Sequence, residues 1–265
     1  MSTNLCKTLI ASGAALSLAS AVQAATFFSF ASDTNDTAYT FSGSAGNGSL
    51  PSSFTLTNDI TSSFSLRVDD GNGGAPEKFV QVKFFATLTA THANSALEPS
   101  GDWRHSYAVT GSFGFNDSIA NTLLLRCDIN AATPALMTAF GTENAWGSSG
   151  AILGSDSFST ITYTATDLLV TRLGGAAMAA MYGIVVPAGG QASSVGPDDF
   201  GFTMTVINSG TPGNLVGLDP TRKTPTTSWK SESSYSGSAL NGIPAPSAAG
   251  LLGLAGVIVA RRRRN

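Results

Sequence analysis

The stretch SSFSLRVDDGNGGAPEKFVQVKFFATLTAT, residues 62–91, decides the fold class. Apolar and polar residues alternate on both sides of the segment 70–74, DGNGG, which has the composition of a tight turn. A period of two places alternate side chains on opposite faces of a strand. The stretch therefore predicts an antiparallel hairpin with one face in a core and the other face toward solvent.

The same alternation recurs along most of the chain. The predicted strands beyond this hairpin cover 27–30, 38–43, 53–57, 103–115, 122–129, 160–173 and 201–208. Gly111 shares a face with the apolar residues of the fourth of these and predicts a bulge or bend there. Gly-rich turns separate the strands, and long segments of period 3.6 are missing from the sequence. We therefore expect an all-β protein, an antiparallel β-sandwich with a jelly roll as one option, over residues 25–210.

Two short segments carry helix signals. The best candidate is 134–140, because Thr133 is a favourable N-cap and Pro134 suits the first helical position. The segment 176–182 is open: its Ala and Met residues favour a helix, but the run Gly-Ile-Val-Val-Pro that follows favours a strand. From 211 to 242 the chain becomes rich in Ser, Thr, Pro and Gly, which predicts a linker.

The N-terminus has the pattern of a secretory signal peptide. Lys7 supplies a positive charge, an apolar stretch follows at 9–22, and Val22-Gln23-Ala24 is a small-residue cleavage pattern. We expect residues 1–24 to be removed by cleavage between Ala24 and Ala25. The mature chain then contains one cysteine, Cys127, which lies on the apolar face of a predicted strand and is expected to be a buried, unreactive thiol.

The C-terminus, IPAPSAAGLLGLAGVIVARRRRN at 243–265, has three parts. Pro244 and Pro246 keep the first part extended, which suits a processing enzyme. The uncharged run 247–260 follows, and 14 helical residues at about 1.5 Å each reach only about 21 Å, short of the roughly 30 Å hydrocarbon core of a bilayer. The block 261–264, four arginines, would stay on the cytoplasmic side. This pattern predicts a temporary membrane anchor.

The tail resembles the PEP-CTERM sorting signal of exported bacterial proteins, which combines a Pro-x-Pro motif, a short apolar stretch and terminal arginines. The usual motif is Val-Pro-Glu-Pro, and here Ile243 replaces the Val and Ala245 replaces the Glu. The resemblance implies an exosortase as partner, cleavage near Pro244 to Pro246, loss of Arg261, Arg262, Arg263 and Arg264, and delivery of the body to the cell surface or extracellular matrix.

Charge excludes one class of partner. The two terminal segments contain five of the 14 basic residues and no Asp or Glu, so the mature body has 9 basic and 17 acidic residues and a formal charge of −8. A body without a basic excess lacks the charge that neutralises phosphates. We therefore expect no nucleic-acid partner.

Few residue patterns point to chemistry. The sequence contains no HExxH, GxSxG, GxGxxG, P-loop or CxxC motif, and its only histidines are His92 and His105. Glu98, Asp102 and His105 share a window with Trp103, and a glycosidase needs such a pair of carboxylates about 5 to 9.5 Å apart. A turn followed by a strand explains the same residues, so we expect a protein that is not an enzyme.

Two weaker patterns suggest ligands. Asp69, Asp70 and Asn72 resemble a fragment of a calcium loop, although a hairpin turn needs the same residue types, and Asp198-Asp199 has a similar ambiguity. Calcium is the only cofactor that the sequence suggests. Trp103 and Trp146 are candidates for stacking on sugars, and Trp229, in the predicted linker, is expected to be the most exposed tryptophan.

These observations give three hypotheses for function. The first is an exported β-sandwich, displayed on the surface or held in the matrix, with a structural or adhesive role. The second is a secreted carbohydrate-binding module with an extracellular polysaccharide as partner. The third is a hydrolase that acts on such a polymer.

Overall fold

The computed structural model describes residues 25–31, 41–43, 53–58, 63–209 and 214–243. The strands are β1 (Thr26–Ala31), β2 (Phe41–Gly43), β3 (Ser53–Asn58), β4 (Phe64–Asp69), β5 (Lys78–Leu97), β6 (Trp103–Asp117), β7 (Leu123–Ile129), β8 (Ala135–Thr142), β9 (Ala145–Gly154), β10 (Ile161–Thr166), β11 (Gln191–Ser193), β12 (Asp198–Asn208), β13 (Val216–Gly217) and β14 (Trp229–Ala239). The helices are α1 (Asp167–Leu173) and α2 (Ala176–Met181). The predicted signal peptide and residues 244–265 lie outside the described part.

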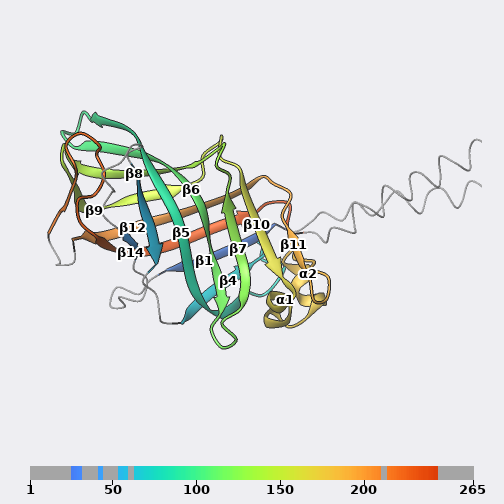
Figure 1. Cartoon of the computed structure of the whole chain (residues 1–265). Helices are drawn as coiled ribbons and strands as arrows, with labels where there is room; N and C mark the ends of the chain where they lie inside the picture. The colour runs from blue at the N-terminus through green and yellow to red at the C-terminus, as the bar shows by residue number, and fades with distance from the viewer. Residues whose placement is uncertain (1–24, 32–40, 44–52, 59–62, 210–213, 244–265) are drawn as a thin grey trace, which may run out of the picture.

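All named strands pair antiparallel within one sheet, which confirms the predicted all-β antiparallel class (Figure 1). The pairings close a ring in the order β1, β4, β5, β6, β8, β9, β12 and β14, and β14 pairs back to β1. Near the start of β14, strands β2 and β3 connect β14 to the middle of β5. The edge of β6 that pairs with β8 over residues 103–109 pairs with β7 over residues 111–116, and β10 and then β11 follow β7 in the sheet.

The predicted hairpin is confirmed as β4 and β5. Phe64, Leu66 and Val68 are buried, and each faces a β5 residue across the ladder, as in the pair Leu66 and Val80. Strand β5 is long enough to pair with β4 near its start, with β3 near its middle and with β6 along most of its length. Gly111 of β6 has φ +118, and a Cβ on it would lie 2.3 Å from the carbonyl oxygen of Thr87, so only glycine fits this crossing.

Aromatic side chains fill the space inside the ring. Phe84 of β5 lies 5.6 Å from Phe202 of β12, and Phe113 of β6 lies 5.6 Å from Tyr235 of β14, measured between ring centroids. These contacts join opposite walls of the ring across a single core. Cys127, predicted as a core thiol, is 1 % exposed on β7, and burial raises its pKa well above the usual value.

Three sequence predictions about local structure are wrong. Residues 134–140 form strand β8 instead of a helix, because Ala135, Met137 and Ala139 alternate into the core between β6 and β9. The predicted strand 160–173 ends at Thr166, and helix α1 begins at Asp167. The chain changes period there, since Leu169, Val170 and Leu173 form one buried helical face. The open segment 176–182 becomes helix α2.

The predicted linker 211–242 is the third error, because it contains β14. This strand pairs with β1 and β2 on one edge and with β12 on the other, so it is central to the sheet. Trp229, expected to be exposed, is fully buried at its start. The body therefore extends to Ile243, which is also fully buried.

Helices α1 and α2 cover one end of the ring (Figure 1). Arg172 of α1 bonds to Asp117 at the end of β6, a carboxylate that also accepts the backbone N–H groups of Ile119 and Ala120. The side-chain hydrogen bond to Arg172 keeps the pKa of Asp117 below its usual value, although burial alone would raise it. Within the described residues, no helix has the length and apolar character needed to cross a membrane.

Candidate functional site

The predicted calcium loop is a hairpin turn whose aspartate carboxylates accept hydrogen bonds from the backbone of the turn itself. Both carboxylate oxygens of Asp70 accept backbone N–H groups, at 3.1 and 3.0 Å from Asn72 and Gly73 and at 3.0 and 2.9 Å from Gly74 and Ala75. Burial alone would raise the pKa of Asp70, but these four donors lower it. Asp69 accepts the N–H of Gly71. Across the described residues, no three His, Cys, Asp or Glu side chains gather as metal ligands would.

The three residues of the predicted hydrolase site do not meet. Glu98 bonds to Arg104, whereas His105, the next residue of the strand, points to the opposite face, as consecutive strand residues do. Asp102 lies exposed in the turn beside Ser100. The catalytic interpretation of these residues is therefore wrong.

His105 belongs instead to a chain of hydrogen bonds that the sequence did not predict. Its Nδ1 lies 2.8 Å from Ser95 Oγ, and the same oxygen lies 2.9 Å from His92 Nε2. Its Nε2 lies 2.9 Å from the carbonyl oxygen of Thr142, which can only accept. His105 therefore carries its proton on Nε2, Ser95 donates to Nδ1, and His92 donates to Ser95. Each bond of the chain has one direction.

A β-bulge makes this chain possible. The register between β5 and β6 shifts by one residue between His92 and Asn94, so His92 faces Tyr107 and Ser95 faces His105. Without the extra residue, His92 and Ser95 would lie on opposite faces. Burial lowers the pKa of both imidazoles, which keeps them neutral and able to accept as well as donate. The chain ties the bulge to the turn between β8 and β9.

The tryptophans differ in their exposure. Trp146 and Trp229 are fully buried, with ring centroids 5.4 Å apart, and Trp146 Nε1 donates to Tyr107 Oη at 3.0 Å. The interpretation of Trp146 as a sugar platform is wrong, because a buried indole offers no face to a ligand. Trp103 is partly buried and stacks on His105, 6.5 Å away between ring centroids.

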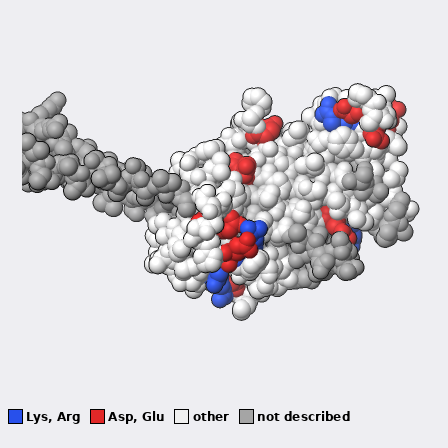
Figure 2. Space-filling view, turned by 180° about the vertical axis from the view of Figure 1, so that it is seen from behind, with Lys and Arg blue, Asp and Glu red and all other residues white. Residues whose placement is uncertain are grey.

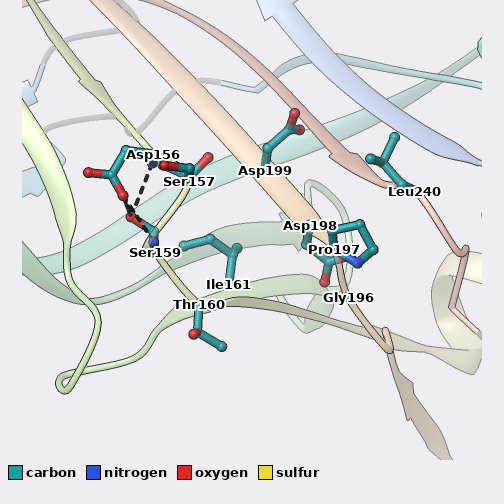
Figure 3. A pocket seen from close by; sticks show the side chains of 11 residues that line it. Asp156, Ser157, Ser159, Thr160, Ile161, Gly196, Pro197, Asp198, Asp199 and Leu240 are labelled. Carbon is teal, nitrogen blue, oxygen red and sulfur yellow. Dashed lines mark hydrogen bonds between the residues drawn. The ribbon is translucent and has the colours of Figure 1, made fainter.

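A pocket that the sequence did not predict lies between the loop after β9 and the start of β12 (Figure 3). Its volume is about 540 Å³. The loop contributes Asp156 and several hydroxyl groups on one side, and β12 contributes Asp198 and Asp199 on the other. Residues more than 40 positions apart in the sequence meet here, through bonds such as the 3.0 Å contact from Phe200 N to Ser155 Oγ.

The three carboxylates of the pocket have different environments. Asp156 Oδ1 accepts the N–H groups of Phe158 and Ser159, and these bonds lower its pKa. Asp198 is half-buried and bonds to Ser194, yet its buried Oδ1 has no hydrogen-bond partner among the described residues, and burial raises its pKa. Asp199 Oδ1 accepts the hydroxyl group of Ser238 at 2.5 Å. Asp156 and Asp199 thus each commit one oxygen to the fold.

The two ends of the body are held side by side. Thr26 Oγ1 donates to the carbonyl oxygen of Tyr182 at 2.5 Å, and Ile243 N donates to that of Gly183 at 2.8 Å. Val185 N in turn donates to the carbonyl oxygen of Ile243 at 2.8 Å. Of the predicted processing residues, Ala25 directly precedes β1 and Ile243 ends the core, whereas Ala24, Pro244 to Pro246 and Arg261 to Arg264 lie outside the described residues.

Charge is sparse on the surface of the body. Figure 2 shows a face on which charged side chains gather in a few small clusters between wide uncharged areas. Arg67 forms ion pairs with both Asp69 and Glu77. No protein family model, curated protein or solved structure matches this chain.

Proposed function

We propose that this chain is an exported protein whose β-sheet body is displayed at the cell surface or in the extracellular matrix in a structural or adhesive role. The observation that carries the proposal is the meeting of both ends of the body at the neighbouring carbonyl groups of Tyr182 and Gly183. The two predicted processing segments are therefore attached at one end of the molecule. Both segments can then lie in the same area of membrane while the body is folded.

The tail leaves little room between body and membrane. Ile243 belongs to the core, and the uncharged run begins at Ser247, so only residues 244–246 lie between them. Three extended residues span at most about 10 to 11 Å. We infer that the body rests close to the membrane while the tail is inserted, and that an exosortase would act on this short segment.

The body itself suits a structural role. Opposite walls of the closed sheet contact each other through Phe84, Phe202, Phe113 and Tyr235, which supports a single well-packed unit; a two-sheet sandwich and a jelly-roll connection stay predictions. The carboxylate oxygens of Asp70 are occupied by its own turn. The carboxylate of Asp70 therefore stabilises the turn between β4 and β5.

Mass spectrometry of the protein from its native host tests the proposal. We expect a mature chain that begins at Ala25 and ends within 244–246. A Pro244→Ala, Pro246→Ala double variant should keep the arginine block and remain in the membrane fraction. The matched control is Pro99→Ala, in an exposed turn of the body, which should be processed normally. Recovery of wild-type protein with an intact Arg261 to Arg264 tail in the extracellular fraction would refute the processing step.

A further inference from the structure

We propose that the end of the body around Ile243 docks onto the lipid bilayer and inserts its exposed apolar side chains into a zwitterionic headgroup region. The docking face consists of Met181, Val185, Val195 and Leu240. Docking rests on the proposed function, because it requires the inserted tail, and it adds which surface of the body contacts lipid. A tether alone would leave the body free to turn above the membrane.

Four large apolar side chains are exposed around the point where the body ends. Val195 is 66 % exposed, Val185 45 %, Leu240 44 % and Met181 43 %. Single exposed apolar residues are common on protein surfaces, whereas apolar residues that gather in one area mark contact with a protein or a membrane. The positions of these four relative to one another therefore decide their meaning.

Hydrogen bonds hold these residues close to Ile243. Val185 N donates to the carbonyl oxygen of Ile243 at 2.8 Å, and the last residue of α2 is only four positions before Val185. Leu240 lies three positions before Ile243. Asn241 Nδ2 donates to the carbonyl oxygen of Val195 at 2.9 Å, which fixes the turn at Leu240 against the segment at Val195. The docking face therefore surrounds the residue from which the tail leaves the core.

The chain segments that meet at this end contain no charged side chain. Residues 173–197 include α2, β11 and Val195, and residues 233–260 include the end of β14, Leu240 and the apolar run of the tail. Neither segment contains Asp, Glu, Lys, Arg or His. Taking an ionised group out of water costs far more than taking out an apolar one. The docking face can therefore enter lipid without that cost.

The tail determines what covers the docking face. Ile243 is fully buried in the body, and the three residues 244–246, which span at most about 10 to 11 Å, separate it from the apolar run. Apolar surfaces that bind at a membrane interface settle about 5 to 10 Å into the boundary between headgroups and acyl chains. When the run is inserted, the headgroup layer is within reach of the residues around Ile243. Lipid is then nearer to this face than a soluble partner.

The charges at the rim of the face favour neutral headgroups over anionic ones. Asp198 and Asp199 directly follow residues 173–197, and the cation that precedes this segment, Arg172, is bonded to Asp117. Attraction to anionic lipids depends on Lys and Arg side chains near the membrane surface. A face that has carboxylates at its rim and an occupied arginine should therefore dock without anionic lipid.

Site-specific fluorescence in proteoliposomes tests the proposal with the full-length chain. Cys6→Ser leaves Cys127 as the only native cysteine, and its burial protects it from labelling. The environment-sensitive dye NBD is attached to Val185→Cys on the docking face, to Leu97→Cys at the last residue of β5, or to Ala255→Cys in the apolar run. The vesicles are phosphatidylcholine, with and without a nitroxide on the headgroup as a contact quencher.

The expected result is selective quenching at the docking face. The nitroxide should quench NBD at Val185→Cys roughly three times as strongly as NBD at Leu97→Cys, because a docked face lies among the headgroups. Leu97 is a matched position, since it is also exposed but lies at the far end of the 20-residue strand β5, whose start is linked through β4 and β1 to the end of β14. Adding phosphatidylglycerol should not strengthen the quenching.

Two double variants separate docking from simple proximity. Val195→Asp with Leu240→Asp places two charges on the face and should lower the quenching at Val185→Cys by roughly half, because ionised groups resist leaving water. Leu97→Asp with Leu215→Asp places the same charges on exposed apolar positions away from the face and should leave the quenching unchanged. The fluorescence of the buried tryptophans checks that both double variants are folded.

Four results would overturn docking: equal quenching at Val185→Cys and Leu97→Cys, quenching that requires phosphatidylglycerol, equal effects of the two double variants, or a blue-shifted dye at Val185→Cys that the nitroxide does not quench. The last result would mean that a second copy of the chain covers the face. The dye at Ala255→Cys reads the anchor separately. A blue shift there without quenching at Val185→Cys would reject docking and keep the anchor, whereas a dye in water there would refute the anchor and docking together.

Discussion

Removal of one residue, Ile243, should destabilise the body far more than removal of the 22 residues that follow it. Full burial of an isoleucine side chain contributes about 1.5 to 3 kcal/mol. The two backbone hydrogen bonds of Ile243, to Gly183 and from Val185, contribute about 0.5 to 1.5 kcal/mol each. Ordering one more residue costs about 1 to 2 kcal/mol. The net loss in the free energy of unfolding is therefore about 3 kcal/mol, within limits of about 0.5 to 5 kcal/mol.

The assay compares chains 25–243 and 25–242 by urea unfolding, followed through the fluorescence of the buried Trp146 and Trp229. With a slope of about 3 kcal/mol per molar urea, the midpoint of the shorter chain should be lower by about 1 M. A third chain, 25–246, should unfold within about 0.2 M of 25–243. Equal midpoints for 25–243 and 25–242 would show that Ile243 belongs to the tail and not to the core.

Three further predictions concern the body. Gly111→Ala should lower the free energy of unfolding by about 2 to 4 kcal/mol, because its Cβ would meet the Thr87 carbonyl oxygen. The control Gly101→Ala also has a positive φ but has open space around it, and it should lower the free energy of unfolding by about 1 kcal/mol. Equal shifts of the two variants in thermal unfolding would contradict the proposed contact. Arg172→Ala should lower the free energy of unfolding by about 1.5 to 3 kcal/mol in the same urea assay, since it leaves the buried Asp117 without its cation. The control Arg126→Ala removes an exposed ion pair with Asp128 and should lower the free energy of unfolding by less than about 1 kcal/mol. Burial lowers the pKa values of His92 and His105 from 6.5, so below pH 6.5 the unfolded chain binds more protons than the folded one. The contribution of the two histidines to the free energy of unfolding should therefore be fully present above pH 6.5 and decline as the pH falls toward their folded pKa values. Urea midpoints between pH 7.5 and 5 should show this slope, and a His105→Gln variant should flatten it; an unchanged slope would contradict the assignment.

The strands that could be predicted from the sequence are those in which large apolar residues alternate with polar ones. Residues 62–91 and 103–115 meet this condition, and they became β4, β5 and β6. The pattern is informative there because each inward position is filled by a side chain of its own.

Strand β14 escaped prediction because only two of its inward positions, Trp229 and Tyr235, are large, and small residues fill the others. Ser231, Ser233 and Gly237 are buried and add little side-chain volume of their own. A Cβ on Gly237 would lie 2.1 Å from Tyr163 Oη, so the packing demands a small residue there. A strand with small residues at most of its inward positions has only a weak hydrophobic period in its own sequence.

The helix signal at residues 133–140 gave a wrong prediction because strand pairing stabilises this segment more than its helix propensity does. Thr133 and Pro134 have the chemistry of a helix start, yet β6 and β9 pair with both edges of the residues that follow. The propensity difference amounts to a few tenths of a kcal/mol per residue, less than burial on a paired strand contributes.

The candidate sites were mostly beyond sequence reasoning. The His92, Ser95 and His105 chain depends on a one-residue bulge that has no local sequence signal. The pocket joins a loop near residue 156 to residues near 198, and the sequence offered only the Asp198-Asp199 pair as a hint. Contacts between distant segments follow from the strand order, which periodicity does not specify.

The central place of β14 also determines how the body would carry mechanical load. A displayed protein that is held by its C-terminal end receives tension at Ile243, and the tension passes directly into β14. The hydrogen bonds of an antiparallel ladder run perpendicular to the strands, and β14 makes such bonds to β1 on one edge and β12 on the other. A pull along this strand would therefore load many bonds at once instead of opening them one by one.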